Sequence, residues 1–262
     1  MSGTLHLLPV PLAAGDPARS LPAGTIAAMR ALPAFLAEDA RSARAHLKAI
    51  GHPLPMATIR IEEIGHHPDP ARFDEWLAPA LAGGELGLLS EAGCPAIADP
   101  GAGIVARAHA LGLRVRPWSG PCSPVLALMA SGVLAQRFSF LGYLPQDAQE
   151  RDAAIGAAER AAAAGTAQAF IETPYRNEKL LEALLRACAP ATRLAVAVDL
   201  TGDGEAVVSL PVSRWRALAP GERPDLARRP AVFVLGPPDG AGTPAPPRTR
   251  APGAQRARGP RH

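Results

Sequence analysis

The chain has 262 residues, 48% hydrophobic and only 4% aromatic, and its 27 basic and 24 acidic side chains give a formal net charge of +3. This length and apolar fraction suffice for a buried core, which excludes a disordered chain or a mini-protein stapled by disulfides. We expect a soluble cytoplasmic protein, because the sequence has no long uncharged apolar run and the first ten residues do not resemble a secretory signal.

Apolar strands alternate with amphipathic segments along most of the chain, which predicts an α/β fold. Little helix separates the strands after residue 193, so we expect antiparallel pairing near the end of the fold. Strands are predicted at 4–8, 34–37, 85–90, 113–116, 137–141, 168–172, 193–199, 206–210 and 231–235, and helices at 40–50, 70–82, 101–111, 123–130, 148–164 and 174–187.

The change of architecture near residues 117–122 predicts two α/β domains, 1–118 and 119–236. The remaining residues, 237–262, carry five Arg, seven Pro and four Gly against one acidic residue, so the tail holds +4 and the rest of the chain −1. Such a segment buries too little apolar surface to offset its ordering entropy, and we expect it to be disordered. It is either a basic arm that attracts RNA or a plain extension.

Metal and disulfide chemistry are not indicated. Cys94, Cys122 and Cys188 contain no C-x-x-C pair, and reduced thiols are expected. The adjacent His66 and His67 lack the i, i+4 spacing of a helical metal site. We therefore expect no metal.

Four loops carry the polar residues of interest, each at a strand end where α/β proteins bind ligands. In the loop 90–101, glycines and prolines fix the backbone path, Glu91 supplies a carboxylate, and Asp99 is predicted to cap the next helix. Small residues at 119–123 allow close approach to the main chain, and Cys122 is interpreted as a spacer rather than a nucleophile because no base lies nearby in the sequence.

The other two loops combine carboxylates with cations. At 170–177 a strand ends in Glu172, and Pro174 is placed at the start of the next helix. Glu172, Tyr175 and Arg176 either orient a substrate or form a capped helix start with an Arg–Glu pair. At 38–44, Asp39 is a predicted N-cap, and the basic residues that follow at helical spacing either contact phosphate or form a solvated face.

Together the loops read E-D-A-R (38–41), S-E-A-G-C-P-A-I-A-D-P-G (90–101), S-G-P-C-S (119–123), G-Y-L-P (142–145) and E-T-P-Y-R (172–176). In this order they resemble the tetrapyrrole methylase superfamily of S-adenosylmethionine-dependent methyltransferases. They are most similar to its branch that methylates a cytidine ribose 2′-hydroxyl in small-subunit ribosomal RNA. The opening loop 8–16, Glu91 in place of Asp and Tyr175 in place of His depart from that branch.

The resemblance implies two αβα domains with the cofactor in the cleft between them, a homodimer and an RNA substrate. Glu172 or Asp39 is the candidate proton acceptor, with Arg176 and Arg41 holding phosphate or ribose. The adenine is expected near 170–172 and 197–200. The cofactor contacts that the resemblance implies are Pro9, Glu91, Gly93, Cys94, Pro95, Ala96, Cys122, Ser123, Ile171, Glu172 and Leu200.

Two alternatives stay open because the opening loop diverges and the body of the chain is nearly neutral. One is a methyltransferase of the same superfamily that acts on a small, tetrapyrrole-like molecule or on a protein. The other is a non-catalytic module that binds S-adenosylmethionine without transferring its methyl group.

Overall fold

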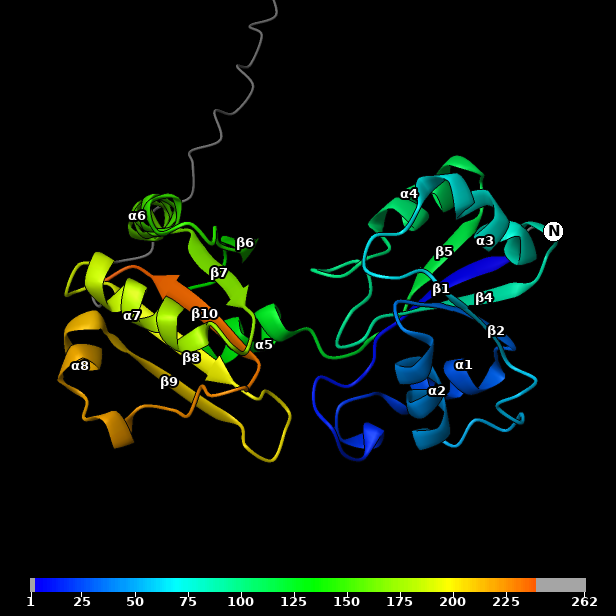
Figure 1. Ribbon diagram of the computed structural model, residues 1–262, viewed down its shortest axis with the longest axis horizontal. Coiled ribbons are helices and arrows are strands. Elements are labelled where there is room, and N and C mark those ends of the chain that lie inside the picture. Colours follow the sequence, from blue (N-terminus) through cyan, green and yellow to red (C-terminus); the bar gives the residue numbers. More distant parts are fainter. Residues whose placement is uncertain (1–2, 239–262) are drawn as a thin grey trace, which may run out of the picture.

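The computed structural model describes residues 3–238 and contains two five-stranded sheets, one in each half of the chain (Figure 1). The first half contains β1 (Thr4–Leu8), α1 (Ala23–Ala31), β2 (Ala34–Ala37), α2 (Ala40–Ala49), β3 (Arg60–Glu63), α3 (Phe73–Leu81), β4 (Glu85–Leu89), α4 (Ala102–Ala110) and β5 (Arg114–Pro117). The second half contains α5 (Ser123–Ser131), β6 (Phe138–Tyr143), α6 (Ala148–Ala163), β7 (Ala167–Glu172), α7 (Asn177–Ala187), β8 (Arg193–Val198), β9 (Ala206–Pro211), α8 (Val212–Ala217) and β10 (Ala231–Gly236).

The first sheet is entirely parallel, with the strand order β3-β2-β4-β1-β5. Helices cover both faces, as the near-continuous apolar strands require. Met29 of α1 and Leu47 of α2 pack with Phe35 on one face, and Trp76 of α3 and Ile104 of α4 belong to the core on the other. All five strands therefore end at the same edge of the sheet.

The second sheet is mixed, with the order β6-β7-β10-β8-β9. Strands β6 and β7 are parallel, whereas β10 pairs antiparallel with both β7 and β8, and β9 pairs antiparallel with β8. The predicted antiparallel ending is confirmed. Because β10 runs against its two neighbours, its amino end meets the carboxyl ends of β7 and β8 at one edge.

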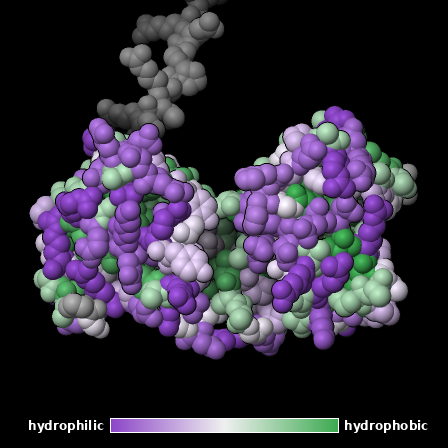
Figure 2. All heavy atoms as spheres, in the orientation of Figure 1, coloured by the Kyte–Doolittle hydropathy of each residue, from purple (hydrophilic) through white to green (hydrophobic). Residues whose placement is uncertain are grey.

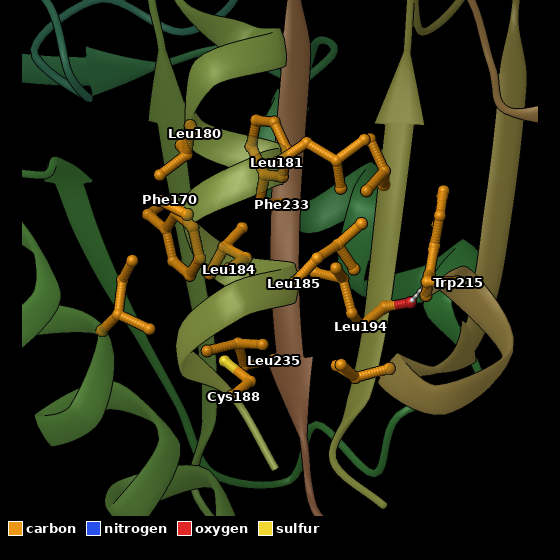
Figure 3. Close-up of a cluster of buried hydrophobic side chains, with 14 of the residues drawn as sticks. Phe170, Leu180, Leu181, Leu184, Leu185, Cys188, Leu194, Trp215, Phe233 and Leu235 are labelled. Carbon is orange, nitrogen blue, oxygen red and sulfur yellow. Dashed lines mark hydrogen bonds between the residues drawn. The ribbon is translucent and has the colours of Figure 1, made fainter. Parts of the chain in front are cut away.

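The larger core of the second half lies between its sheet and helices α6, α7 and α8 (Figure 3). Leu180 and Leu184 of α7 reach this core, where the rings of Phe170 and Phe233 stack with centroids 5.9 Å apart. Trp215 of α8 is fully buried and donates its indole N–H to the carbonyl of Leu194 at 2.7 Å. On the opposite face, α5 packs through small and aliphatic side chains, so this sheet is also covered on both faces.

The two halves form separate lobes, joined by the chain that leaves β5 and enters α5 (Figure 1). An exposed ion pair, Arg19 Nη1 to Asp203 Oδ1 at 2.6 Å, also links them. The predicted boundary between residues 118 and 119 falls in the connection and stays a prediction. The predicted disordered tail lies outside the described residues except for its first two.

The predicted elements are found, with shifts of one or two residues at most ends. The predicted helix 174–187 begins only at Asn177, because Thr173 to Arg176 form a turn. One strand, two α-helices and the short 3-10 helices Pro17–Arg19 and Pro220–Glu222 were not predicted. Strand β3 is a polar edge strand, α1 buries only Thr25 and Met29, and α8 has six residues.

No helix within residues 3–238 is long and apolar enough to cross a membrane.

Candidate functional site

Three loops at the carboxyl edge of the first sheet are bound to one another. The loop after β1 pairs with the loop after β4, because Val10 and Gly93 exchange backbone hydrogen bonds of 2.9 and 3.1 Å. The Ser90 hydroxyl donates to the Gly93 carbonyl at 2.9 Å, and the Cys94 thiol donates to the carbonyl of Pro121 at 3.4 Å. These bonds hold the β1, β4 and β5 loops as one surface.

Glycine is required where these loops touch. A Cβ at Gly120 would lie 2.3 Å from the Cβ of Pro9, and Gly93 has a φ of 72°. At both positions a larger residue would force the loops apart or strain the backbone. The small residues predicted to allow close approach thus bring the loops against one another.

The loop from Gly93 to Gly101 is strained, and it leaves one buried carboxylate oxygen without a hydrogen-bond partner. Ala96 and Ala98 have positive φ values of 65° and 62°, which L-residues seldom adopt. The prediction that Asp99 caps the next helix is wrong, because Gly101 is the N-cap of α4 and makes no side-chain cap bond. Among the described residues, the buried Oδ2 of Asp99 has no hydrogen-bond partner.

Burial, together with the negative charges of Glu38 and Glu91, raises the pKa of Asp99 to about 7. Glu38 is itself buried, and its pKa is also raised because burial outweighs the opposing contact with His66. This wall of the site therefore favours a cation, which would relieve the repulsion among the carboxylates.

The second sheet presents a facing edge. A register shift in β6 between Phe140 and Tyr143, with Gly142 at a φ of 65°, breaks the regular alternation just before the strand ends. At the neighbouring position on β7, Glu172 is opposite Ala231, and Ala231 is in turn opposite Val198 of β8. The ends of β6, β7 and β8 and the start of β10 thus meet here.

Glu172 is the buried carboxylate of this edge. Its Oε1 accepts from Arg176 Nη2 at 2.6 Å, from Arg176 Nε at 2.9 Å and from the Thr173 backbone N–H at 2.6 Å. Three donors on one oxygen fix the side chain in place. No hydrogen bond to Oε2 is found among the described residues, so this oxygen is available to a ligand.

Residues of both halves line a cavity of about 230 Å³ between the two edges. Figure 2 shows hydrophobic side chains at the floor of the cleft between the lobes and hydrophilic ones on its rims. Most lining residues are apolar, with Asp99 on one side and Glu172 on the other. The lining residues are Leu12, Ala92, Ile97, Ala98, Asp99, Ser123, Tyr143, Ile171, Glu172, Pro174, Ala197, Leu200, Pro230, Ala231 and Val232.

Four of the predicted cofactor residues, Ser123, Ile171, Glu172 and Leu200, line this cavity. The others support the loops around it. Pro9 packs against Gly120, and Glu91 lies beside Ser42 with an oxygen–oxygen distance of 3.5 Å. The predicted residues that do not line the cavity are Pro9, Glu91, Gly93, Cys94, Pro95, Ala96 and Cys122.

The predicted catalytic residues divide into two groups. Glu172 lines the cavity and is paired with Arg176, which lies beside it, whereas Asp39 and Arg41 lie at the start of α2 and do not line the cavity. Asp39 accepts from the Ser42 N–H at 2.6 Å, as its predicted N-cap role requires, and this bond lowers the pKa of Asp39.

Cys122 is the N-cap of α5, and it does not line the cavity. The neighbouring Cys94 thiol lowers the pKa of Cys122. Among the described residues, no group of three or more His, Cys, Asp and Glu side chains could hold a metal ion.

Sequence reasoning missed Asp99, Tyr143 and Leu12 as cavity residues. An Asp before a helix usually caps it, so the sequence predicts a capping role for Asp99 rather than a place in a cavity. Tyr143 belongs to the G-Y-L-P motif, but its position depends on the bulge in β6. For Leu12, the one available signal in the sequence is its place in the opening loop that follows β1.

The fold, with two sheets and a site between them, is also found in solved methyltransferase structures. The structure is similar to uroporphyrin-III-C-methyltransferase from Thermus thermophilus, with a TM-score of 0.51 and 20% identity over 90% of this chain and 93% of that one. It is also similar to the methyltransferase CobJ, with a TM-score of 0.60 and 17% identity over 90% and 95% of the two chains. At these identities the likeness shows the fold.

Residues 13–214 match the family model of the tetrapyrrole (corrin/porphyrin) methylases, and the chain belongs to this family. It is 28% identical to ribosomal RNA small subunit methyltransferase I of Escherichia coli O157:H7, over 89% of this chain and 77% of the relative. The proteins of the same name from Pseudomonas aeruginosa and Micromonospora olivasterospora are 28% and 31% identical, over 81% and 78% of this chain and 71% and 61% of theirs.

The protein is therefore a methyltransferase that uses S-adenosylmethionine, and the cavity fits that cofactor. The positively charged sulfonium matches the carboxylate of Asp99, whose buried Oδ2 has no hydrogen-bond partner among the described residues. Apolar side chains such as Ile171 and Val232 suit an adenine ring.

Proposed function

We propose that the protein transfers a methyl group from S-adenosylmethionine to a ribose 2′-hydroxyl of small-subunit ribosomal RNA. The name shared by the relatives from three bacteria supports the acceptor. The observation that carries the proposal is the pair of carboxylates, Asp99 and Glu172, contributed to one apolar cavity by different sheets.

The two carboxylates have different tasks in this account. Asp99 would supply the counter-charge to the sulfonium, and Ala197 and Val232 belong to the apolar wall that would hold the adenosine. When bound, the cofactor supplies an electrophilic methyl group. The contribution of the protein is to align the acceptor hydroxyl with that methyl group and to exclude water.

Glu172 is the proposed proton acceptor. The ribose hydroxyl loses a proton as it attacks, and a positioned carboxylate can receive it. Arg176 and the Thr173 N–H hold Oε1, which leaves Oε2 directed to the acceptor. Asp39 is less suited to this role because its carboxylate caps α2 outside the cavity.

We further propose that the protein acts in the cytoplasm as a homodimer. Among the described residues, ten large hydrophobic side chains are exposed, and six of them fall between residues 125 and 143. This segment includes α5 and β6, and β6 is an edge strand of its sheet. An exposed apolar edge of this kind is suited to cover by a second copy of the chain.

The acceptor is tested by mapping ribose methylation in ribosomal RNA from wild-type and deletion strains. Purified protein with labelled S-adenosylmethionine is then added to small subunits from the deletion strain. We expect one ribose methylation to be missing in the deletion strain and restored in vitro. An unchanged map, or labelling of a tetrapyrrole or protein instead, would contradict the proposed acceptor.

A further inference from the structure

A second, smaller hollow lies beside Glu172 and outside the cofactor cavity. Its volume is about 90 Å³. It is formed by the end of β7, the first turn of α6 and the start of α7. Its lining residues are Gln146, Arg151, Glu172, Arg176, Lys179 and Leu180, so three cations surround a single carboxylate.

Arg151 is an unusual lining residue because it is buried without a carboxylate partner. It is only 7% exposed, and its Nη1 donates to the carbonyl of Gln146 at 3.0 Å. Its buried Nε has no hydrogen-bond partner, and it forms no ion pair among the described residues. The nearby Asp147 is engaged in capping α6. A buried guanidinium left in this state favours an anion.

The other two cations add to this preference. Arg176 and Lys179 are three residues apart, which places them on one side of the start of α7. Arg176 is paired with Glu172, whereas Lys179 is exposed and has no ion-pair partner in the described part of the chain. The hollow thus holds two cations that form no ion pair in the described part of the chain.

Glu172 lines both this hollow and the cofactor cavity. In RNA, neighbouring carbons of one ribose carry the 2′-hydroxyl and the 3′-phosphate. An acceptor with its hydroxyl at Glu172 would therefore bring a backbone phosphate next to that carboxylate. We propose that the hollow of Arg151, Arg176 and Lys179 is a phosphate subsite, which holds the RNA backbone beside the ribose that is methylated. This inference rests on the proposed function.

The test compares the two lysines of the chain. Lys179→Ala and Lys179→Glu remove or reverse the charge at the subsite. Lys48→Ala is the matched control, because Lys48 is also exposed on a helix, α2, but in the other half and away from the hollow. Each protein is titrated with purified small-subunit ribosomal RNA at several salt concentrations, and with S-adenosylhomocysteine alone.

We expect Lys179→Ala to weaken RNA binding about 5- to 10-fold and to lower the salt dependence by roughly 0.7 in log–log slope, the value for one lost phosphate contact on a single strand. Lys179→Glu should weaken it further. The KM for RNA should rise with little change in kcat. Affinity for S-adenosylhomocysteine should stay the same in all variants.

Equal effects of Lys179→Ala and Lys48→Ala would overturn the subsite, because general attraction to RNA would then explain both. A further titration uses inorganic pyrophosphate. Heat with the wild type but not with Lys179→Ala, while RNA binding is unchanged, would assign the hollow to a free phosphate instead. RNA binding that depends on Lys179 without methyl transfer by the wild type would contradict the proposed acceptor and keep the subsite. Methyl transfer that is the same in the wild type and Lys179→Ala would contradict the subsite and keep the proposed acceptor.

Discussion

Asp99 and Glu172 approach the cavity from different sheets, and their surroundings prepare them for different charges. Glu172 is paired with Arg176, so its negative charge is already balanced. Burial and two nearby carboxylates disfavour the charged form of Asp99 and raise its pKa to about 7. A bound sulfonium would supply the cation that Asp99 lacks, whereas the spent cofactor, S-adenosylhomocysteine, would not.

This difference predicts a pH dependence that separates the two forms of the cofactor. The Asp99 carboxylate is ionised mainly above pH 7, so affinity for S-adenosylmethionine should fall as the pH drops from 8 to 6, while affinity for S-adenosylhomocysteine should change little. Asp99→Asn should weaken S-adenosylmethionine about 10-fold at pH 8, which corresponds to one partly screened charge pair. Calorimetry measures the affinities for both ligands across this pH range. Parallel pH profiles in the wild type would contradict the role of Asp99.

The raised pKa also has a consequence for stability. The folded state holds the Asp99 proton more tightly than the unfolded state does, so ionisation costs stability as the pH rises from about 4 to 7. Without cofactor, Asp99→Asn should therefore be about 1 kcal/mol more stable than the wild type at pH 8, and the difference should shrink toward pH 4. Thermal unfolding at the two pH values checks this, and a destabilised variant at pH 8 would refute it.

For Glu172 the prediction concerns rate. Glu172→Gln keeps the shape but removes the proton acceptor, and it should slow methyl transfer about 100-fold or more with nearly unchanged affinity for S-adenosylhomocysteine. Asp39→Asn is the control, because Asn also caps helices well. Single-turnover transfer to deficient small subunits separates the two. Equal rates for Glu172→Gln and the wild type would remove Glu172 from the mechanism.

At the scale of elements, the loops work because they pack on one another. Gly120→Ala would place a methyl group 2.3 Å from the Cβ of Pro9. We expect a loss of about 1–3 kcal/mol in stability and weaker binding of S-adenosylhomocysteine. Gly24→Ala is the control, since a Cβ there meets nothing within 4 Å and helix α1 should gain up to about 1 kcal/mol. Denaturant unfolding measures the stability of both variants. A Gly120→Ala protein with unchanged stability would show that the loop contact is dispensable.

The elements also show how far sequence reasoning reaches. Apolar periodicity predicts the buried strands. Strands β1, β4 and β10 are buried on both faces, and their sequences are accordingly mostly apolar. It misses β3, whose Arg-Ile-Glu-Glu sequence reflects an exposed edge. Local motifs predict Glu172 and Ser123 at the site. They misassign Asp99, because whether an Asp caps a helix or faces a cavity depends on strained backbone at Ala96 and Ala98 that composition does not reveal.

For the whole molecule, the two lobes contribute opposite electrostatics to one cleft. The first half supplies Glu38, Glu91 and Asp99, which suit a cation, and the second supplies the cations beside Glu172, which suit a polyanion. The net charge of the whole chain is only +3 and does not reveal this difference between the two lobes. Substrate and cofactor would thus be sorted by the side of the cleft that each approaches.

Dimerisation is a further property of the whole molecule. Met129 on α5 is 75% exposed in a segment rich in exposed apolar side chains. If a second copy covers this segment, Met129→Glu should convert a dimer to a monomer and leave the secondary structure unchanged. Leu54→Glu, at an exposed position in the other half, should have no effect. Light scattering gives the masses, and a monomeric wild type at micromolar concentration would contradict the dimer.

The cavity between the sheets is tested most directly by titrating S-adenosylhomocysteine into the wild type and Ala92→Trp. Ala92 lines the cavity from an exposed loop, so the indole would occupy the space of the ligand without disturbing the core. The expected result is one ligand per chain for the wild type and at least 100-fold weaker binding for Ala92→Trp, with normal binding by Ala82→Trp at the exposed end of α3. No heat with the wild type, or equal binding by Ala92→Trp, would contradict the cavity as the cofactor site.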